Sequence, residues 1–249
     1  MRIDGQTALV TGASRGIGAA IAQALAEKGA DVLAGVRSPG DYAGPGRAVR
    51  VDLSSRDEND ACAAALPLPE IDILVNNAGQ MTGGLLEEQD TGEIYSMFQA
   101  NLVGLTHLTA RVLPSMIERG SGKIVNNASI SGYAFFPAAS TYAASKAGVV
   151  AFTESLHREL AGTGVSTLHL VTPGVNTDML DATEEVYGRH MDTAEWPKVE
   201  PGEWAARVVR AIERDDRVLG PGGRLGFAKL ASRGPAQLVD AISRRMFTR

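Results

Sequence analysis

Short apolar runs alternate along the chain with longer segments that are rich in helix-forming residues. Runs of this length, bounded by turn residues, are typical of buried strands. They predict strands at 7–11, 31–36, 48–51, 71–75, 123–127, 165–171 and 218–219. The segments between them predict helices at 19–28, from about 54, at 92–119, at 140–161 and at 202–214. This alternation predicts an α/β fold in which a seven-stranded parallel sheet is covered by helices on both faces.

The 249 residues suffice for one large doubly wound domain, and no linker divides them, so we expect a single domain over 1–249. Residues 178–201 show no strong period and are expected to form a lid or substrate segment. Residues 224–249 form a basic C-terminal extension with six Lys or Arg and one Asp. Within it, residues 235–247 fit an amphipathic helix that could touch a membrane surface, although packing on this or a neighbouring subunit is the preferred interpretation.

Composition narrows the possible functions. The net charge of −5 argues against a polybasic surface for nucleic acid. The single cysteine, Cys62, cannot form an internal disulfide, and it is expected to be a small apolar residue on a helix. The four histidines are far apart, so no metal site is predicted. The sequence starts without a leader pattern and has no run of membrane-spanning length, so we expect a cytoplasmic protein.

A glycine-rich turn follows the first predicted strand and leads into the first helix. Such a turn lets the backbone approach a pyrophosphate closely, and the helix N-terminus presents unpaired N–H groups to it. The alternative is a packing turn without a ligand. The residues predicted to bind phosphate are Gly12, Ser14, Arg15, Gly16, Ile17 and Gly18.

Arg37 follows the second strand, where a site selective for NAD usually has an acidic residue. A guanidinium can bind a 2′-phosphate through two N–H groups, and Arg15 could supply a second charge. We therefore expect NADP(H) rather than NAD(H), unless Arg37 is only a solvated loop residue. Asp52, followed by Leu53 at the end of the third strand, could bind an adenine amino group, cap the next helix, or do both.

Asparagines stand at two further places where they affect backbone structure. Asn77, Ala78 and Gly79 follow the fourth strand, where small residues would let the backbone approach a cofactor. Asn101 lies inside the helix predicted at 92–119, although asparagine is a poor residue for a helix interior. If buried, it could distort the helix and hold a water molecule; otherwise it is an exposed and tolerated residue.

Tyr142 and Lys146 are four residues apart, which places them on one face of a helix. A nearby ammonium favours a phenolate, so the pKa of Tyr142 is expected to be lowered, which suits proton transfer near neutral pH. Ser129 lies just beyond the fifth strand, at the carboxyl end of the sheet, where open α/β sheets bind ligands. A chance helical pair would be the alternative if these residues stood alone.

These motifs together resemble the short-chain dehydrogenase/reductase family over about residues 5–220. They are Thr11-Gly-Ala-Ser-Arg-Gly-Ile-Gly18, Asn76-Asn-Ala-Gly79, Asn101, Ser129, Tyr142-x-x-x-Lys146 and Pro173-Gly174, all in the family's order. The first forty residues particularly resemble 3-oxoacyl-carrier-protein reductases, but that region concerns the cofactor rather than the substrate.

The resemblance implies a role for each matching residue. Tyr142 would exchange a proton with a carbonyl or alcohol oxygen, and Ser129 would polarise that oxygen. Lys146 would lower the Tyr142 pKa and hold the nicotinamide ribose, and Asn101 would hold a water that links Lys146 to solvent. Pro173, Gly174 and Thr177 would contact the nicotinamide end, although Thr177 stands one residue nearer to Pro173-Gly174 than the family's pattern has it.

The sequence therefore predicts an oxidoreductase that transfers a hydride between NADP(H) and a small carbonyl or alcohol substrate. An apolar substrate is expected from the residues in segments that should border the site, which are Phe135, Phe136, Met179, Leu180 and Trp196. A narrower alternative is a 3-oxoacyl-thioester reductase, and an alternative of another class is a non-catalytic nucleotide-binding regulatory protein. The family also implies a homo-oligomer, a dimer or tetramer formed through the helices at 92–119 and 140–161.

Overall fold

The protein, described here by a computed structural model over residues 1–190 and 197–222, is built on a seven-stranded parallel sheet. Its strands are β1 (Thr7–Thr11), β2 (Asp31–Val36), β3 (Arg47–Arg50), β4 (Ile73–Asn76), β5 (Gly122–Asn127), β6 (Val165–Leu170) and β9 (Val218–Leu219). They stand in the order β3-β2-β1-β4-β5-β6-β9. The predicted fold class is confirmed, and the order reverses beside β1, where doubly wound sheets bind ligands.

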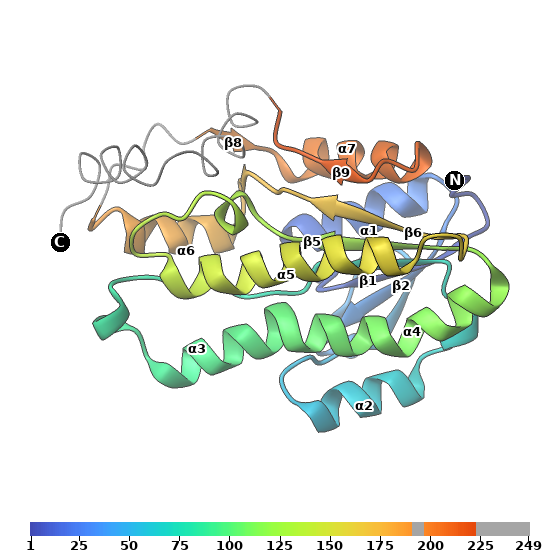
Figure 1. Ribbon diagram of the computed structural model, residues 1–249, viewed down its shortest axis with the longest axis horizontal. Coiled ribbons are helices and arrows are strands. Elements are labelled where there is room, and N and C mark those ends of the chain that lie inside the picture. The colour runs from blue at the N-terminus through green and yellow to red at the C-terminus, as the bar shows by residue number, and fades with distance from the viewer. Residues whose placement is uncertain (191–196, 223–249) are drawn as a thin grey trace.

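Helices cover both faces of this sheet (Figure 1). The helices are α1 (Gly16–Glu27), α2 (Arg56–Ala65), α3 (Thr91–Phe98), α4 (Leu105–Arg119), α5 (Ser140–Glu159), α6 (Asp178–Tyr187) and α7 (Pro201–Glu213). The apolar residues of α1 and α7 pack together on one face, whereas those of α2, α4 and α5 pack on the other. None of the described helices is long and apolar enough to cross a membrane.

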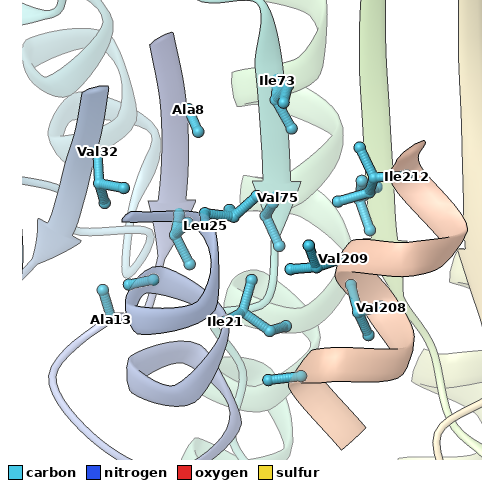
Figure 2. Packing of buried hydrophobic residues seen from close by; sticks show 14 of the residues in the cluster. Ala8, Ala13, Ile21, Leu25, Val32, Ile73, Val75, Val208, Val209 and Ile212 are labelled. Atoms are coloured by element: carbon cyan, nitrogen blue, oxygen red, sulfur yellow. The ribbon is translucent and has the colours of Figure 1, made fainter. Parts of the chain in front are cut away.

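Alternation along the strands divides the core into two layers. On β1, Ala8 and Val10 belong to the layer under α1 and α7, while Leu9 belongs to the opposite layer. Figure 2 shows the first layer, in which Ile21 of α1 and Val209 of α7 meet Val75 of β4. A strand that is buried on both faces needs apolar residues at every position, which explains the continuous apolar runs in the sequence.

The helical pattern predicted as one helix at 92–119 is interrupted. A π-helical segment, Gln99–Gly104, separates α3 from α4. Asn101 lies in this segment and is fully buried, so the exposed alternative is wrong and the predicted distortion is confirmed. π-helical turns are rare and frequently occur at functional sites.

The segment predicted to lack regular structure is partly regular. It contains α6 and the short strand β8 (Lys198–Val199), which pairs in parallel with β7 (Gly174–Val175). The prediction of an irregular segment over 178–201 was wrong in this respect, because the short helix and the two-residue strand leave too little periodicity to detect. Residue Trp196, the helix predicted at 235–247 and the whole basic extension lie outside the described residues.

A buried lysine near the start of β5 joins the sheet to the turn after α7. The side chain of Lys123 on β5 is fully buried, and its Nζ lies 2.6 Å from Asp215 Oδ1. The ammonium also donates to the main-chain oxygens of Thr167 (3.4 Å) and Asp216 (3.1 Å), so it is compensated in spite of its burial. Burial lowers the pKa of Lys123, and the Asp215 carboxylate acts in the opposite direction.

Asp215→Asn is expected to lower the free energy of unfolding by roughly 3 kcal/mol, because it leaves the buried Lys123 without its counter-charge. Asparagine is chosen because residue 215 has a φ of +57°, which asparagine tolerates. Urea denaturation provides the measurement. Lys123→Met removes the charge and keeps the length of the side chain, so it should cost less; an equal or larger loss in that variant would contradict the ion-pair interpretation.

Candidate active site

The glycine loop packs tightly against the segment that follows β4. A Cβ atom at Gly12, whose φ is +68°, would come within 2.9 Å of Ala78 Cα. A Cβ at Gly18 would lie 2.1 Å from the Gly12 carbonyl oxygen. Thr11 Oγ1 accepts hydrogen bonds from the main-chain N–H groups of Asn77 and Ala78, each at 3.0 Å. Both glycines are therefore required by close packing, and the loop is fixed to the segment that follows β4.

The start of α1 fits a phosphate group. Arg15 occupies the N-cap position without a side-chain capping bond, and the first turn of the helix contains no acidic residue. Such a helix end presents donors and a positive dipole to an anion. The exposed side chains of Ser14 and Arg15 flank it, and Arg15 Nη1 lies 3.5 Å from Asp178 Oδ2 at the start of α6. Half-buried Ile17 packs on the core layer beneath and anchors the turn.

The far end of the candidate cofactor site is formed at the ends of β2 and β3. Arg37 is exposed directly after β2. Asp52 Oδ1 accepts from the Ser54 N–H at 3.0 Å, and Ser55, not Asp52, caps α2. The capping alternative for Asp52 was therefore wrong, since a residue nearer to the helix takes that position.

Asp52 and Leu53 are held in place through their main chains. The predicted helical position of Cys62 is confirmed, and its buried Sγ also accepts from the Asp52 N–H at 3.1 Å. Leu53 is buried, and its carbonyl oxygen accepts from Gln99 Nε2 at 3.3 Å, which connects this end of the site to the π-helical segment.

Ser129, Tyr142 and Lys146 come together at the carboxyl end of β5, and each side chain is buried. Burial raises the pKa of Tyr142 to about 12, and a side-chain hydrogen bond with Ser129 acts in the opposite direction. The predicted lowering of this pKa was wrong for this structure, because desolvation is the largest cause of the shift. The Lys146 ammonium Nζ lies 5.9 Å from the Tyr142 ring centroid. Burial also lowers the pKa of Lys146 to about 8.

Asn101 and Gly79 bring the π-helical segment close to Lys146. A Cβ at Gly79 would meet Asn101 Oδ1 at 2.9 Å and Lys146 Nζ at 3.7 Å, so Gly79 allows this approach. The Asn101 side chain accepts from the Gln80 N–H (2.8 Å) and donates to Gln80 O (2.9 Å) and to Ser145 Oγ (3.1 Å). Because these bonds occupy the side chain, Asn101 fixes the chain directly after Gly79.

Pro173, Gly174 and Thr177 lie beyond β6, beside the same edge of the sheet. A Cβ at Gly16 would lie 3.3 Å from Thr177 Cγ2, so Thr177 contacts the glycine loop. Thr177 Oγ1 donates to Val175 O at 3.1 Å. A Cβ at Gly174 would lie 3.7 Å from Leu180 Cδ2, which places this α6 side chain against the turn. The structure thus brings the predicted site residues to the carboxyl edge of the sheet, with Arg37, Asp52 and Leu53 at the β2–β3 end of that edge.

Two residues near the candidate catalytic group were missed by sequence reasoning. Tyr187 on α6 is buried in a cluster with Ala138, Ala139, Met81 and Phe136. Burial raises its pKa, and the nearby Tyr142 adds to this shift. Gln80 was missed because its main chain, rather than its side chain, binds Asn101. No motif in residues 178–187 pointed to Tyr187.

Of the apolar residues expected to border the substrate site, two are packed against other residues and two are exposed. Phe136 packs in the Tyr187 cluster and Leu180 lies against Gly174, whereas Phe135 and Met179 are exposed. No group of three or more His, Cys, Asp or Glu side chains in residues 1–190 and 197–222 is arranged to hold a metal ion.

Comparisons with known proteins agree with this geometry. A model of the short chain dehydrogenase family matches residues 6–187. A ketoacyl reductase, HetN, of Nostoc sp. is 39% identical over 184 residues, which are 69% of this chain and 64%, just under two thirds, of that protein. A 3-oxoacyl-[acyl-carrier-protein] reductase of Vibrio cholerae is 38% identical over 195 residues, covering 74% of this chain and 80% of that one.

A solved structure extends the similarity to nearly the whole chain. A short chain dehydrogenase from Burkholderia cenocepacia in complex with NADP has a TM-score of 0.84 and 27% sequence identity, and the alignment covers 98% of this chain and 99% of that one. The matched residues 6–187 contain the glycine loop, Asn101, Ser129, Tyr142 and Lys146. The chain therefore belongs to the short-chain dehydrogenase/reductase family, and it is an oxidoreductase of that family close to the 3-oxoacyl-carrier-protein reductases.

Proposed function

We propose that this protein is an NADP(H)-dependent carbonyl reductase or alcohol dehydrogenase. The observation that carries the proposal is the buried group of Ser129, Tyr142 and Lys146 beside an uncapped helix end that is joined to a tightly packed glycine loop. The bound cofactor would supply or accept the hydride. The NADP-bound relative supports this choice of cofactor.

The side chains divide the proton chemistry between them. Tyr142 keeps its proton at neutral pH, since its pKa is about 12, and donates it to the carbonyl oxygen as negative charge develops there. Ser129 Oγ accepts from the Ser131 N–H at 3.1 Å, so its own proton is directed towards Tyr142 or the substrate oxygen. In the protonated state, Lys146 would stabilise the phenolate that remains and would hold the ribose hydroxyls of the bound cofactor. Asn101 would support the water that returns a proton to Lys146 through the π-helical backbone.

The charges at the adenosine end support a preference for NADP(H). Arg37 is exposed directly after β2, where a carboxylate would repel a 2′-phosphate and a guanidinium would bind it. Arg15 is also exposed, at the start of α1, and would add a second positive charge, although Asp178 lies 3.5 Å from it. Asp52 would bind the adenine amino group. Asn77, Ala78, Gly79, Pro173, Gly174 and Thr177 would then contact the rest of the cofactor.

The narrower alternative is reduction of a 3-oxoacyl thioester, which is favoured by the names of the two similar reductases. The buried apolar cluster around Tyr187 and Phe136 is compatible with an acyl chain and also with an apolar ketone. A homo-oligomer and a cytoplasmic location stay predictions. A non-catalytic regulatory protein is separated from both enzymes by the first experiment below.

Tyr142→Phe is expected to reduce NADPH oxidation with a panel of ketones, aldehydes and acyl thioesters by about a hundredfold or more, because the proton donor is removed. NADPH binding, followed by its fluorescence, should persist. If turnover in this variant equalled that of the wild type, the mechanism would be wrong. A wild type that binds NADPH and turns over none of the panel would favour the regulatory alternative.

Arg37→Asp is expected to shift the ratio of kcat/KM for NADPH to that for NADH by about tenfold or more towards NADH, because a carboxylate repels the 2′-phosphate. Arg47→Asp on β3 makes the same change of charge at another exposed arginine and should leave the ratio close to that of the wild type. An equal shift in both variants would indicate a general effect of surface charge rather than contact with the phosphate.

The pH dependence of carbonyl reduction should report on Lys146. With a pKa of about 8, Lys146 loses its charge as the pH rises through 8, while Tyr142 with a pKa of about 12 stays protonated. We therefore expect kcat/KM for reduction to fall above about pH 8. Lys146→Arg, whose guanidinium stays charged, should lack this limb even if it is slower. An unchanged limb in that variant would assign the limb to another group.

A further inference from the structure

Asn127, the last residue of β5, forms hydrogen bonds with three separate segments of the candidate site. Its side-chain Nδ2 donates to Asn77 Oδ1 at 2.9 Å, and its Oδ1 accepts from Thr172 Oγ1 at 2.5 Å. Its main-chain oxygen accepts from Lys146 Nζ at 2.9 Å. Asn127 is buried and stands two residues before Ser129.

Each of these partners leads to a different part of the site. Asn77 Nδ2 donates to Thr11 O at 3.1 Å and to Gly12 O at 3.5 Å, so it reaches the glycine loop. The main-chain oxygen of Thr172 accepts from the Ile130 N–H at 2.9 Å, directly after Ser129. Thr172 also precedes Pro173 and Gly174. Asn127 therefore stands between the candidate phosphate loop, the candidate nicotinamide segment and the candidate catalytic lysine.

An amide is suited to this position for a chemical reason. It donates through its NH₂ group and accepts through its oxygen from a single rigid plane, whereas a carboxylate only accepts and an aliphatic side chain does neither. Because the group is buried, water does not readily replace a lost partner. An aspartate would leave Asn77 Oδ1 without its donor, and an aliphatic side chain would leave both Asn77 and Thr172 without their bond.

We propose that Asn127 is a positioning residue that holds Lys146 and the cofactor-contacting segments in register across the carboxyl edge of the sheet. This inference rests on the proposed function for its kinetic consequence. Its effect acts through Lys146, Asn77 and Thr172, and Asn127 itself would touch neither the substrate nor the reacting atoms.

The first test replaces Asn127 by leucine, which has a similar volume and no hydrogen-bonding group. We expect the Kd of NADPH, measured by fluorescence titration without substrate, to rise by about tenfold and kcat to fall by ten- to a hundredfold, since small misplacements of reacting groups have effects of this size. We also expect the high-pH limb of kcat/KM to move, because the environment of Lys146 changes.

A matched control comes from the other side of the same strand. Thr153→Val removes the hydroxyl that accepts from Asn126 Nδ2 at 2.9 Å, a bond that is equally buried but leads away from the glycine loop. This variant should lose thermal stability while its Kd for NADPH, kcat and pH limb stay close to those of the wild type. Equal kinetic losses in the two variants would show that Asn127 acts only through general stability and would overturn the proposal.

A pair of milder variants covers the case in which the leucine protein does not fold. Thr172→Val removes one of the two side-chain bonds of Asn127 and should shift Kd and kcat in the same direction by a smaller factor, whereas Thr172→Ser keeps the hydroxyl and should restore both. If valine and serine behave alike, or neither changes Kd, kcat or the pH limb, the proposal is wrong. Because Kd is measured without turnover, a wild type that reduces no carbonyl would defeat the proposed function and leave this binding test readable.

Discussion

Four neighbouring strands, β1, β4, β5 and β6, end at the carboxyl edge of the sheet. The polar side chains at these strand ends need hydrogen-bond partners in a place where water has little access. Thr11, Asn77, Asn127 and Thr172 meet this requirement by hydrogen-bonding to each other and to the main chain across β1, β4, β5 and β6. The glycine loop can approach because Gly12 and Gly18 have no Cβ, and Asn101 can approach because Gly79 has none. The shape of the site thus follows from how the strand ends are paired and packed.

The same burial determines the electrostatics of the site. Removing water raises the pKa of Tyr142 and lowers that of Lys146, so both groups are held closer to their neutral forms than their chemistry would suggest. A neutral phenol is the form that donates a proton, so this environment suits the reduction of a carbonyl. Residue spacing carries no information about burial. For this reason, the spacing of Tyr142 and Lys146 predicted the correct partners but the wrong direction of the shift in the Tyr142 pKa.

Sequence reasoning reached the sheet, its strands and the convergence of Ser129, Tyr142 and Lys146, since each depends on local periodicity or on a motif at a strand end. It did not reach α6, because a ten-residue helix between irregular segments has a weak period. It missed Tyr187 and Gln80 for a different reason: Tyr187 is placed by tertiary packing, and Gln80 binds Asn101 through its main chain. Side-chain identity carries no signal for such contacts. Asn127 was visible only as the end of a strand, since its partners are distant in sequence.

The π-helical segment changes how α3 and α4 are oriented about their common axis. A π turn holds more residues than an α turn, so it shifts the phase of the helix that continues after it. The side-chain directions of α3 are consequently rotated about the helix axis, relative to those of α4, by about the rotation of one α-helical residue, or about 100°. Deleting one residue between 99 and 104 would favour a straight helix and would turn the side chains of α3, such as the exposed Tyr95, to a new direction relative to α4. A chain with an uninterrupted helix here would therefore align with this one only through a one-residue gap, even where every apolar position is kept.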